Sequence, residues 1–212
     1  MTGIADIAIS ARVVTTAVPV AIYFLVLGLL QTRRRPQMLS GRADFALLMA
    51  ALGPLVFLPA MSYLGGSVLA VIVAAVSLVG AILLLSPAGR SWVVYNVSPH
   101  AARDAVAAAL GAMGLDFARS AGGFVVPSAQ VTISVESFPI LRNATVRLAG
   151  GDKPFARTFQ AALARRLSAL ECHASPMAVS MLLAAMVLLV APLAMMAQDA
   201  PQIVRLLTDL LR

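Results

Sequence analysis

Three side chains near the start of the last apolar segment could together hold a soft metal ion. Cys172, His173 and Met177 offer a thiolate, an imidazole and a thioether, which is a donor set that suits Cu(I). Methionine is also an ordinary flexible filler of apolar regions, and this chain contains ten. The sequence therefore predicts no metal and no cofactor, and this trio is the alternative to test.

Groups for enzymatic catalysis are scarce. The histidines are His100 and His173, the glutamates are Glu136 and Glu171, and a single cysteine excludes an internal disulfide or a multi-cysteine cluster. The sequence contains no H-E-x-x-H motif, P-loop, dinucleotide-binding glycine pattern or Ser-His-Asp spacing. We expect a protein that is not an enzyme.

Arginines supply most of the polar chemistry that the chain does have. Three adjacent positive charges at a membrane surface can bind anionic lipid head groups, at about 1 kcal/mol per residue. They can equally act only by fixing the orientation of the protein in the membrane. The candidate lipid-binding or orienting residues are Arg33, Arg34, Arg35, Arg42, Arg165 and Arg166.

A net charge of +7 and a pI near 11.0 are also typical of proteins that bind nucleic acid. A nucleic-acid surface needs aromatic side chains among its basic residues, whereas the aromatic residues between 87 and 175 fall at positions typical of a core. We therefore expect no nucleic-acid partner. The use of arginine and alanine in place of lysine suggests a bacterial source with a GC-rich genome.

The composition indicates a membrane protein, so these basic residues are held by elements that lie next to membrane-spanning segments. The chain is 60% hydrophobic and 12% charged, whereas a soluble domain has about 25% charged residues. Four stretches are close to the roughly 20 apolar residues that span a bilayer, and none has a charge in its interior. They are residues 13–30, 45–64, 67–85 and 177–197.

This pattern predicts four segments in chain order. Residues 1–86 hold three transmembrane helices, residues 87–175 form a small polar domain, residues 176–198 form the fourth transmembrane helix, and residues 199–212 form an amphipathic helix. The apolar face of that last helix would lie on the outer leaflet or on a partner helix. Its members are Ile203, Val204, Leu207, Leu210 and Leu211.

Small residues recur at helical spacing in the third span. Gly66, Ala70 and Ala74 lie four residues apart and therefore on one helix face. Small residues at this spacing let two helix backbones approach closely. We expect this face to pack inside the bundle or against a second copy.

The charge distribution predicts the orientation. Thirteen of the 16 basic residues lie between residues 31 and 44 or within residues 87–175. Since basic residues collect on the cytoplasmic side, we expect a multi-pass protein of the cell inner membrane. Residues 87–175 would be cytoplasmic and both termini outside.

The polar domain is predicted to contain strands and helices in the order β-α-β-β-β-β-α. Ser98-Pro99 is typical of a helix start, and Gly114 of its end. A second helix begins near Pro154. Apolar residues along one face of each helix indicate packing on one face of a mostly antiparallel sheet: Ala102, Val106, Leu110 and Met113, then Phe155, Phe159, Leu163, Leu167 and Leu170. The fold class is thus membrane α-helical with an inserted two-layer α+β domain.

These observations favour a membrane subunit or scaffold. Its cytoplasmic domain would bind a protein partner or a second copy, and membrane lipids would be the other partner. The alternative is a small channel or transport component gated by the domain, which the proline-rich spans suggest.

Overall fold

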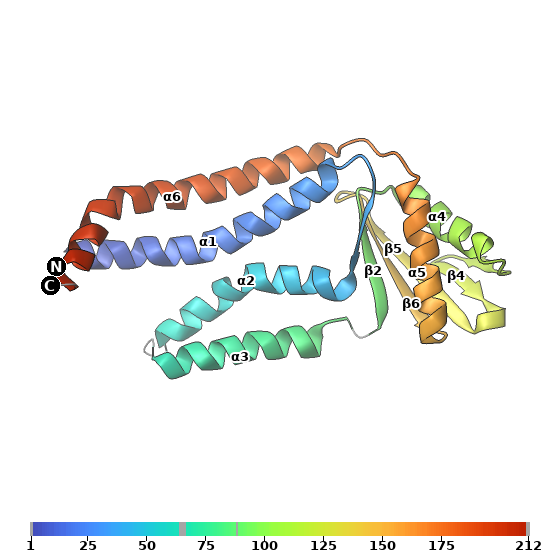
Figure 1. Ribbon diagram of the computed structural model, residues 1–212, viewed down its shortest axis with the longest axis horizontal. Coiled ribbons are helices and arrows are strands. Elements are labelled where there is room, and N and C mark those ends of the chain that lie inside the picture. The colour runs from blue at the N-terminus through green and yellow to red at the C-terminus, as the bar shows by residue number, and fades with distance from the viewer. Residues whose placement is uncertain (1, 64–66, 88, 211–212) are drawn as a thin grey trace. The chain divides into compact units, whose positions relative to one another are not determined.

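The computed structural model describes residues 2–63, 67–87 and 89–210 (Figure 1). The helices of the described chain are α1 (Thr2–Thr32), α2 (Gly41–Tyr63), α3 (Val68–Leu85), α4 (Pro99–Ala112), α5 (Lys153–Ser168) and α6 (Pro176–Leu210). The strands are β1 (Gln37–Ser40), β2 (Arg90–Tyr95), β3 (Ala118–Ser120), β4 (Gly123–Val126), β5 (Val131–Phe138) and β6 (Asn143–Gly150), with a single 3-10 turn, η1 (Pro127–Ala129), after β4.

The chain divides into two compact units. The helical unit contains Met1–Val26, Leu47–Ala81 and Ser180–Arg212, and the α+β unit contains Leu27–Ala46 and Ile82–Val179. The α+β unit is therefore larger than the predicted domain of residues 87–175. It also takes in the segment that joins α1 to α2.

The sheet of the α+β unit explains this difference. It has six strands in the order β1-β2-β6-β5-β4-β3, with every neighbouring pair antiparallel. Residues 87–175 supply the predicted order β-α-β-β-β-β-α. The sixth strand, β1, comes from the predicted loop after the first span and pairs with β2, Leu39 opposite Val93.

Local sequence signals determine where the two helices of this unit, α4 and α5, begin and where α4 ends. The Ser98 hydroxyl accepts a hydrogen bond from the Ala101 amide at 3.2 Å, and the Asp152 carboxylate accepts one from the Phe155 amide at 2.7 Å. Each side chain satisfies an amide of the first helical turn that has no partner within the helix. Gly114 follows α4 with φ of +68°, a conformation that glycine adopts without steric cost. The predicted start and end of α4 are thus confirmed.

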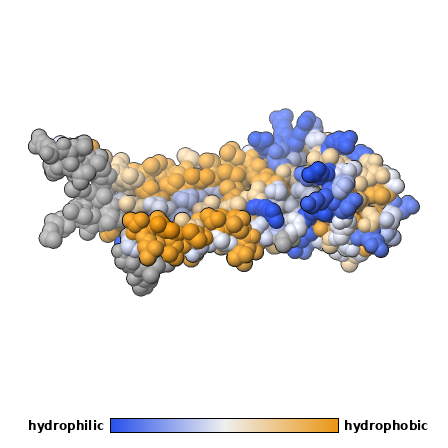
Figure 2. All heavy atoms as spheres, turned by 60° about the horizontal axis from the view of Figure 1, so that its bottom comes forward, coloured by the Kyte–Doolittle hydropathy of each residue, from blue (hydrophilic) through white to orange (hydrophobic). Residues whose placement is uncertain are grey.

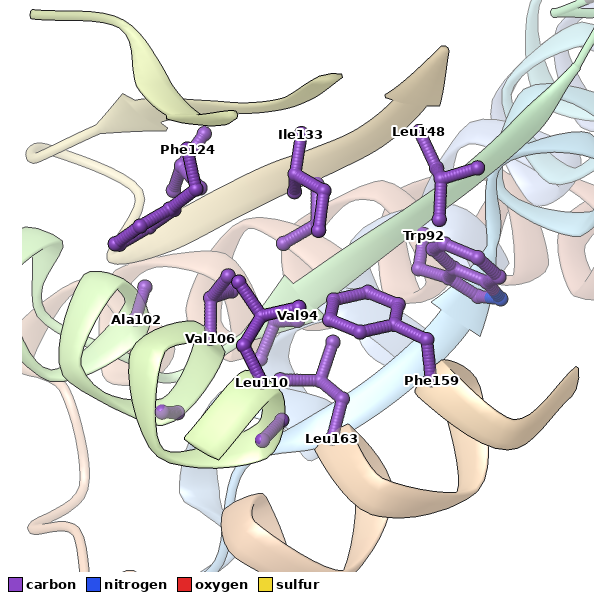
Figure 3. Packing of buried hydrophobic residues seen from close by; sticks show 14 of the residues in the cluster. Trp92, Val94, Ala102, Val106, Leu110, Phe124, Ile133, Leu148, Phe159 and Leu163 are labelled. Carbon is purple, nitrogen blue, oxygen red and sulfur yellow. The ribbon is translucent and has the colours of Figure 1, made fainter. Parts of the chain in front are cut away.

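The hydrophobic core lies between the sheet and the pair α4 and α5. Figure 3 shows Val106, Leu110, Phe159 and Leu163 of the two helices directed toward the strands. Phe159 is fully buried, and its ring centroid lies 6.0 Å from that of Trp92 on β2. The predicted apolar stripes do form this core, with Met113, Phe155 and Leu170 at its margin. The two-layer arrangement is therefore confirmed.

The other face of the sheet is covered at one edge only. Val93 and Tyr95 point away from α4 and α5, yet both are buried. The Tyr95 hydroxyl donates a hydrogen bond to the Asp44 carboxylate in the first turn of α2. On β5 and β6, by contrast, Thr132, Glu136 and Arg147 are exposed on this face.

The helical unit consists of apolar helices. Three are long and apolar enough to cross a membrane: Ile9–Thr32, Gly41–Pro59 and Pro176–Gln198. Val71–Leu85 of α3 is a shorter apolar helix, so a fourth spanning helix is not established by length and composition alone. In the space-filling view, hydrophobic residues gather over the helices and hydrophilic residues over the α+β unit (Figure 2).

Two details of the helical unit differ from simple expectation. Helix α6 continues without a break through Pro192 and Pro201, so the structure does not separate a fourth span from a C-terminal helix. Helices α2 and α3 meet where Gly53 approaches the Leu78 side chain, because a Cβ at Gly53 would lie 3.2 Å from Leu78. Leu78 follows Ala74 by four residues, so α3 contacts α2 here through a leucine on the same helix face as Ala74.

Candidate functional site

The first candidate site is the segment of residues 31–36, called the arginine segment below, which begins in the last turn of α1. Its backbone is held at three places. The amide of Cys172 donates to the carbonyl of Arg34 at 2.8 Å, and the amide of Ser175 donates to that of Gln31 at 3.3 Å. The Asn96 side-chain amide donates to the carbonyl of Arg33 at 2.8 Å. The segment is therefore fixed to the turn after β2 and to the linker before α6.

The three arginines of this segment are exposed while its backbone is held. Arg33, Arg34 and Arg35 are all exposed, whereas Gln31 and Pro36 are buried. Three consecutive residues of a constrained backbone thus carry exposed guanidinium groups. Such a surface can bind phosphate or carboxylate groups, because guanidinium donors match the geometry of both.

The turn after β2 depends on an unusual backbone conformation. Asn96 has φ of +57°, which asparagine tolerates better than most residues. Its side chain is fully buried and reaches the carbonyl of Arg33. The next amide, that of Val97, donates to the carbonyl of Arg142 at 2.9 Å. Asn96 and Val97 therefore join the arginine segment to the turn between β5 and β6.

Cys172 and His173 lie next to this segment. A cavity of about 410 Å³ is lined by Thr32, Arg34, Glu171, Cys172, His173 and Ala174. Burial raises the pKa of the Cys172 thiol above its ordinary value, and the positive charge of Arg142 partly opposes this. Since the thiolate is the metal ligand, the raised pKa disfavours metal binding near neutral pH.

The predicted soft-metal trio is only partly brought together. Cys172 and His173 share the cavity, and Met177 does not line it. Among the described residues, no group of three or more His, Cys, Asp or Glu side chains could hold a metal ion. A site completed by a methionine thioether is a different kind of group, so the trio stays an untested alternative to the prediction of no metal.

The second candidate site is the uncovered part of the sheet, called the open sheet face below. A cavity of about 580 Å³ is lined there by Pro87, Gly89, Arg90, Ser91, Thr132, Ser134, Arg147, Leu148 and Ala149. The Arg90 guanidinium donates to the carbonyls of Gly150 and Gly151 at 3.2 and 3.0 Å. Arg147 forms an exposed ion pair with Glu136 at 3.5 Å. The lining offers hydroxyls and guanidiniums, which bind polar or acidic groups.

The remaining predicted arginines lie elsewhere on the unit. Arg42 is exposed near the start of α2. Arg165 and Arg166, in the last turn of α5, line a separate groove of about 390 Å³ against the end of α4. The cavities that Arg34 and Arg165 line share no residue.

Several predicted packing residues lie partly outside the described residues. Gly66 and Leu211 are outside, as are the side chains of Ala70, Ile203, Leu207 and Leu210; Ala74 is half-buried and Val204 exposed. Their predicted roles in helix packing and in the amphipathic C-terminal face therefore stay predictions.

Sequence reasoning missed the residues that tie the site together. Asn96 and Gln31 are both buried, and neither belongs to a periodic pattern. The Gln31 side-chain amide and the Asn96 carbonyl oxygen have no hydrogen-bond partner among the described residues. The asparagine itself was the one available signal, because asparagine is enriched at positive φ, the conformation that Asn96 adopts.

No protein-family model, no curated protein and no solved structure matches this chain. The function of this chain is therefore inferred from the geometry of its own residues.

Proposed function

We propose that this chain is a four-span membrane protein that acts as a non-catalytic subunit or scaffold, with the α+β unit binding a partner protein. The observation that carries the proposal is the pairing of β1 with β2. Strand β1 joins α1 to α2, and β2 follows α3. Three apolar helices, α1, α2 and α3, are thus joined through the chain to strands of one sheet. Helix α5 of the same unit is followed in the chain by α6.

This connectivity supports four crossings. Helix α2 leaves the sheet after β1, and α3 returns to it before β2. If α2 crosses the bilayer, α3 must cross back, because both join the same sheet. The 18 residues of α3 would extend about 27 Å at 1.5 Å per residue, which is close to the roughly 30 Å of hydrocarbon.

Burial supports lipid as the solvent of these helices. Only 17% of the residues in each of the three apolar windows are buried within the structure. Exposed apolar side chains include Val56, Val68, Leu84 and Val187, each at least 64% exposed. A water-soluble protein rarely exposes contiguous apolar surface on this scale. The proposed location is the inner membrane of the cell, with the arginine-rich α+β unit in the cytoplasm and both termini outside.

The native cysteine tests this orientation. We expect a membrane-impermeant maleimide to label Cys172 in inverted membrane vesicles but not in intact spheroplasts. Because burial raises the thiol pKa, less thiolate is present near neutral pH than in a free cysteine. The labelling rate in inverted vesicles should therefore still increase at a pH where a free thiol has reached its plateau.

Two variants complete the labelling experiment. Arg142→Gln removes the charge that opposes the shift, so its labelling curve should move to higher pH. Cys172→Ser should abolish labelling and serves as the control. Labelling of the native chain from outside intact spheroplasts would reverse the proposed orientation.

The open sheet face is the proposed partner-binding surface. Its cavity is lined by Thr132, Ser134, Arg90 and Arg147 together with Pro87, Leu148 and small residues, and none of the lining side chains is acidic. Glu136 lies on the same face and pairs with Arg147 at 3.5 Å, so a partner that presents acidic groups would compete with Glu136 for this arginine. Such charge complementarity mainly determines specificity and association rate. A lining of arginine, serine and threonine without a general base or a nucleophile pair favours binding over catalysis.

Site-specific photo-crosslinking in cells tests this function. A benzophenone amino acid at Thr132, on the open sheet face, is expected to give a discrete crosslinked protein band. The matched control is the same amino acid at Gln160, which is exposed on α5. Arg147→Glu should weaken the Thr132 band by charge reversal.

The crosslinking result can also contradict the proposal. Equal crosslinking at Thr132 and Gln160, or a Thr132 band unchanged by Arg147→Glu, would remove the open sheet face as a binding surface. The channel alternative stays a prediction, and solute flux through proteoliposomes is its test.

A further inference from the structure

The turn between β5 and β6 exposes two large apolar side chains. Phe138 is 61% exposed and Ile140 is 80% exposed, with Pro139 between them also exposed. The turn itself is ordered: the Arg142 amide donates to the carbonyl of Pro139 at 3.2 Å. Residues 138–142, called the hairpin tip below, therefore present a small, fixed apolar surface.

Within the α+β unit, the hairpin tip lies beside the arginine segment. The Arg142 carbonyl accepts from the Val97 amide at 2.9 Å. The adjacent residue, Asn96, donates to the Arg33 carbonyl at 2.8 Å. Two hydrogen bonds and one peptide link thus connect the tip to three exposed arginines.

The same arginine segment begins where an apolar helix ends. The candidate span Ile9–Thr32 runs directly into it. The Gln31 carbonyl accepts from the Ser175 amide, one residue before the candidate span Pro176–Gln198. The cytoplasmic ends of two candidate spans are therefore joined at this level, which is where lipid head groups would lie.

The residue types match this position. Aromatic and aliphatic side chains next to arginines are typical of segments that lie in the membrane interface, with the apolar groups among the acyl chains and the cations at the head groups. The exposed Phe138 and Ile140 beside three exposed arginines therefore fit a position at the membrane interface.

We infer that the hairpin tip and the arginine segment form a binding site for the bilayer surface, in which Phe138 and Ile140 insert between anionic lipid head groups that Arg33, Arg34 and Arg35 bind. Through the hairpin tip, this site attaches the α+β unit to the membrane at a point other than its covalent links to the spans. It depends on the membrane placement of α1 and α6 proposed above.

Depth-dependent fluorescence quenching tests the inference on the full chain. In a Cys172→Ser background, Ile140→Cys is labelled with the dye NBD, and the protein is reconstituted at one copy per nanodisc. Ser128→Cys is the matched control, because it is exposed and lies before β5, at the strand end opposite Phe138. Ile22→Cys, from the apolar part of α1, reports the membrane placement itself.

The expected result is a pattern across the three labels. In nanodiscs of phosphatidylcholine and phosphatidylglycerol, the Ile140 label should show blue-shifted emission and strong quenching by lipids with a shallow spin label. The Ser128 label should show emission as in water. Replacing Arg33, Arg34 and Arg35 with glutamine should reduce the quenching at Ile140 toward the value in phosphatidylcholine alone.

Each contrary result has a single meaning. An Ile140 label that behaves like the Ser128 label, while the Ile22 label is quenched by deep spin labels, overturns the inference and leaves the membrane placement intact. Loss of quenching at Ile22 instead overturns the membrane placement. Quenching at Ile140 that changes neither with lipid charge nor with the arginine substitutions overturns the proposed binding of anionic head groups by the arginines. Fluorescence of the buried Trp92 verifies that each variant is folded.

Discussion

Phe159→Ala is expected to lower the free energy of unfolding of the α+β unit by about 3–5 kcal/mol, the range observed for removal of a buried aromatic ring. Phe159 is fully buried. Its ring lies 6.0 Å from Trp92 and 6.4 Å from Phe155, between centroids. Alanine would leave a cavity at the point where α5 meets the sheet.

Trp92 makes this loss measurable. It is the only tryptophan of the chain and is itself buried against Phe159. Its fluorescence during urea unfolding in mild detergent should therefore report the α+β unit and not the apolar helices. A loss of this size would be a large fraction of the stability of a typical domain, about 5–15 kcal/mol.

Gln160→Ala is the matched control for this experiment. Gln160 is the next residue of α5 and is exposed. Substitutions at such positions usually change stability by less than about 0.5 kcal/mol. If Phe159→Ala were as mild as Gln160→Ala, α5 would not be packed on the sheet as described.

The core around Phe159 is the part of the fold that the sequence predicts best. Phe159, Leu163 and Leu167 recur at intervals of four residues, and a helix places such residues on one face. Val131, Ile133 and Val135 alternate with polar residues, and a strand places these on one face. Both patterns are local, so they can be read without knowledge of the tertiary structure, and all six residues are buried.

Strand β1 shows why the rest could not be predicted. It has only four residues, Gln37–Ser40, too few for alternation to be distinguished from chance. Its partner β2 follows much later in the chain, beyond two apolar helices. The charged residues around it also suit a simple cytoplasmic loop. Its place in the sheet depends on long-range pairing, which no local pattern records.

The candidate site likewise has a part that local sequence patterns predict and a part that depends on long-range contacts. The exposed side chains of Arg33, Arg34 and Arg35 are evident as a run of charge, so their role at the membrane surface can be predicted from position alone. The hydrogen bonds that hold their backbone come from Asn96, Cys172 and Ser175 and are long-range. Phe138 and Ile140 belong to neither predicted apolar helix face, and only the structure shows that both are exposed.

Strand β1 is also the element on which the proposed crossings depend, and a disulfide tests its pairing. Leu39 and Val93 are directly opposite in the β1–β2 register, so their Cβ atoms should be about 4.5–5.5 Å apart, near the range that a disulfide bridges. In a Cys172→Ser background, Leu39→Cys with Val93→Cys is expected to form a disulfide on mild oxidation. Closing a loop of this length should stabilise the chain by about 4 kcal/mol in the entropic model.

A protease site introduced between α2 and α3 makes the crosslink visible. After cleavage, the fragments of the oxidised double variant should run together on a non-reducing gel and separate on reduction. Ser40→Cys with Val93→Cys is the control. Ser40 pairs with Trp92, and successive side chains of a strand point to opposite faces, so this pair should not form a disulfide.

The outcome decides more than one strand pairing. If the cysteines introduced at Leu39 and Val93 join and those of the Ser40 control do not, the segment after α1 and the segment after α3 lie on the same side of the membrane. Helices α2 and α3 must then both cross it or both stay out, and their exposed apolar surfaces favour crossing, because lipid can cover them and water cannot without cost. Fragments of the oxidised double variant that separate without reduction would detach β1 from the sheet. Nothing would then require the 18-residue α3 to return the chain to the side of the membrane that α2 left.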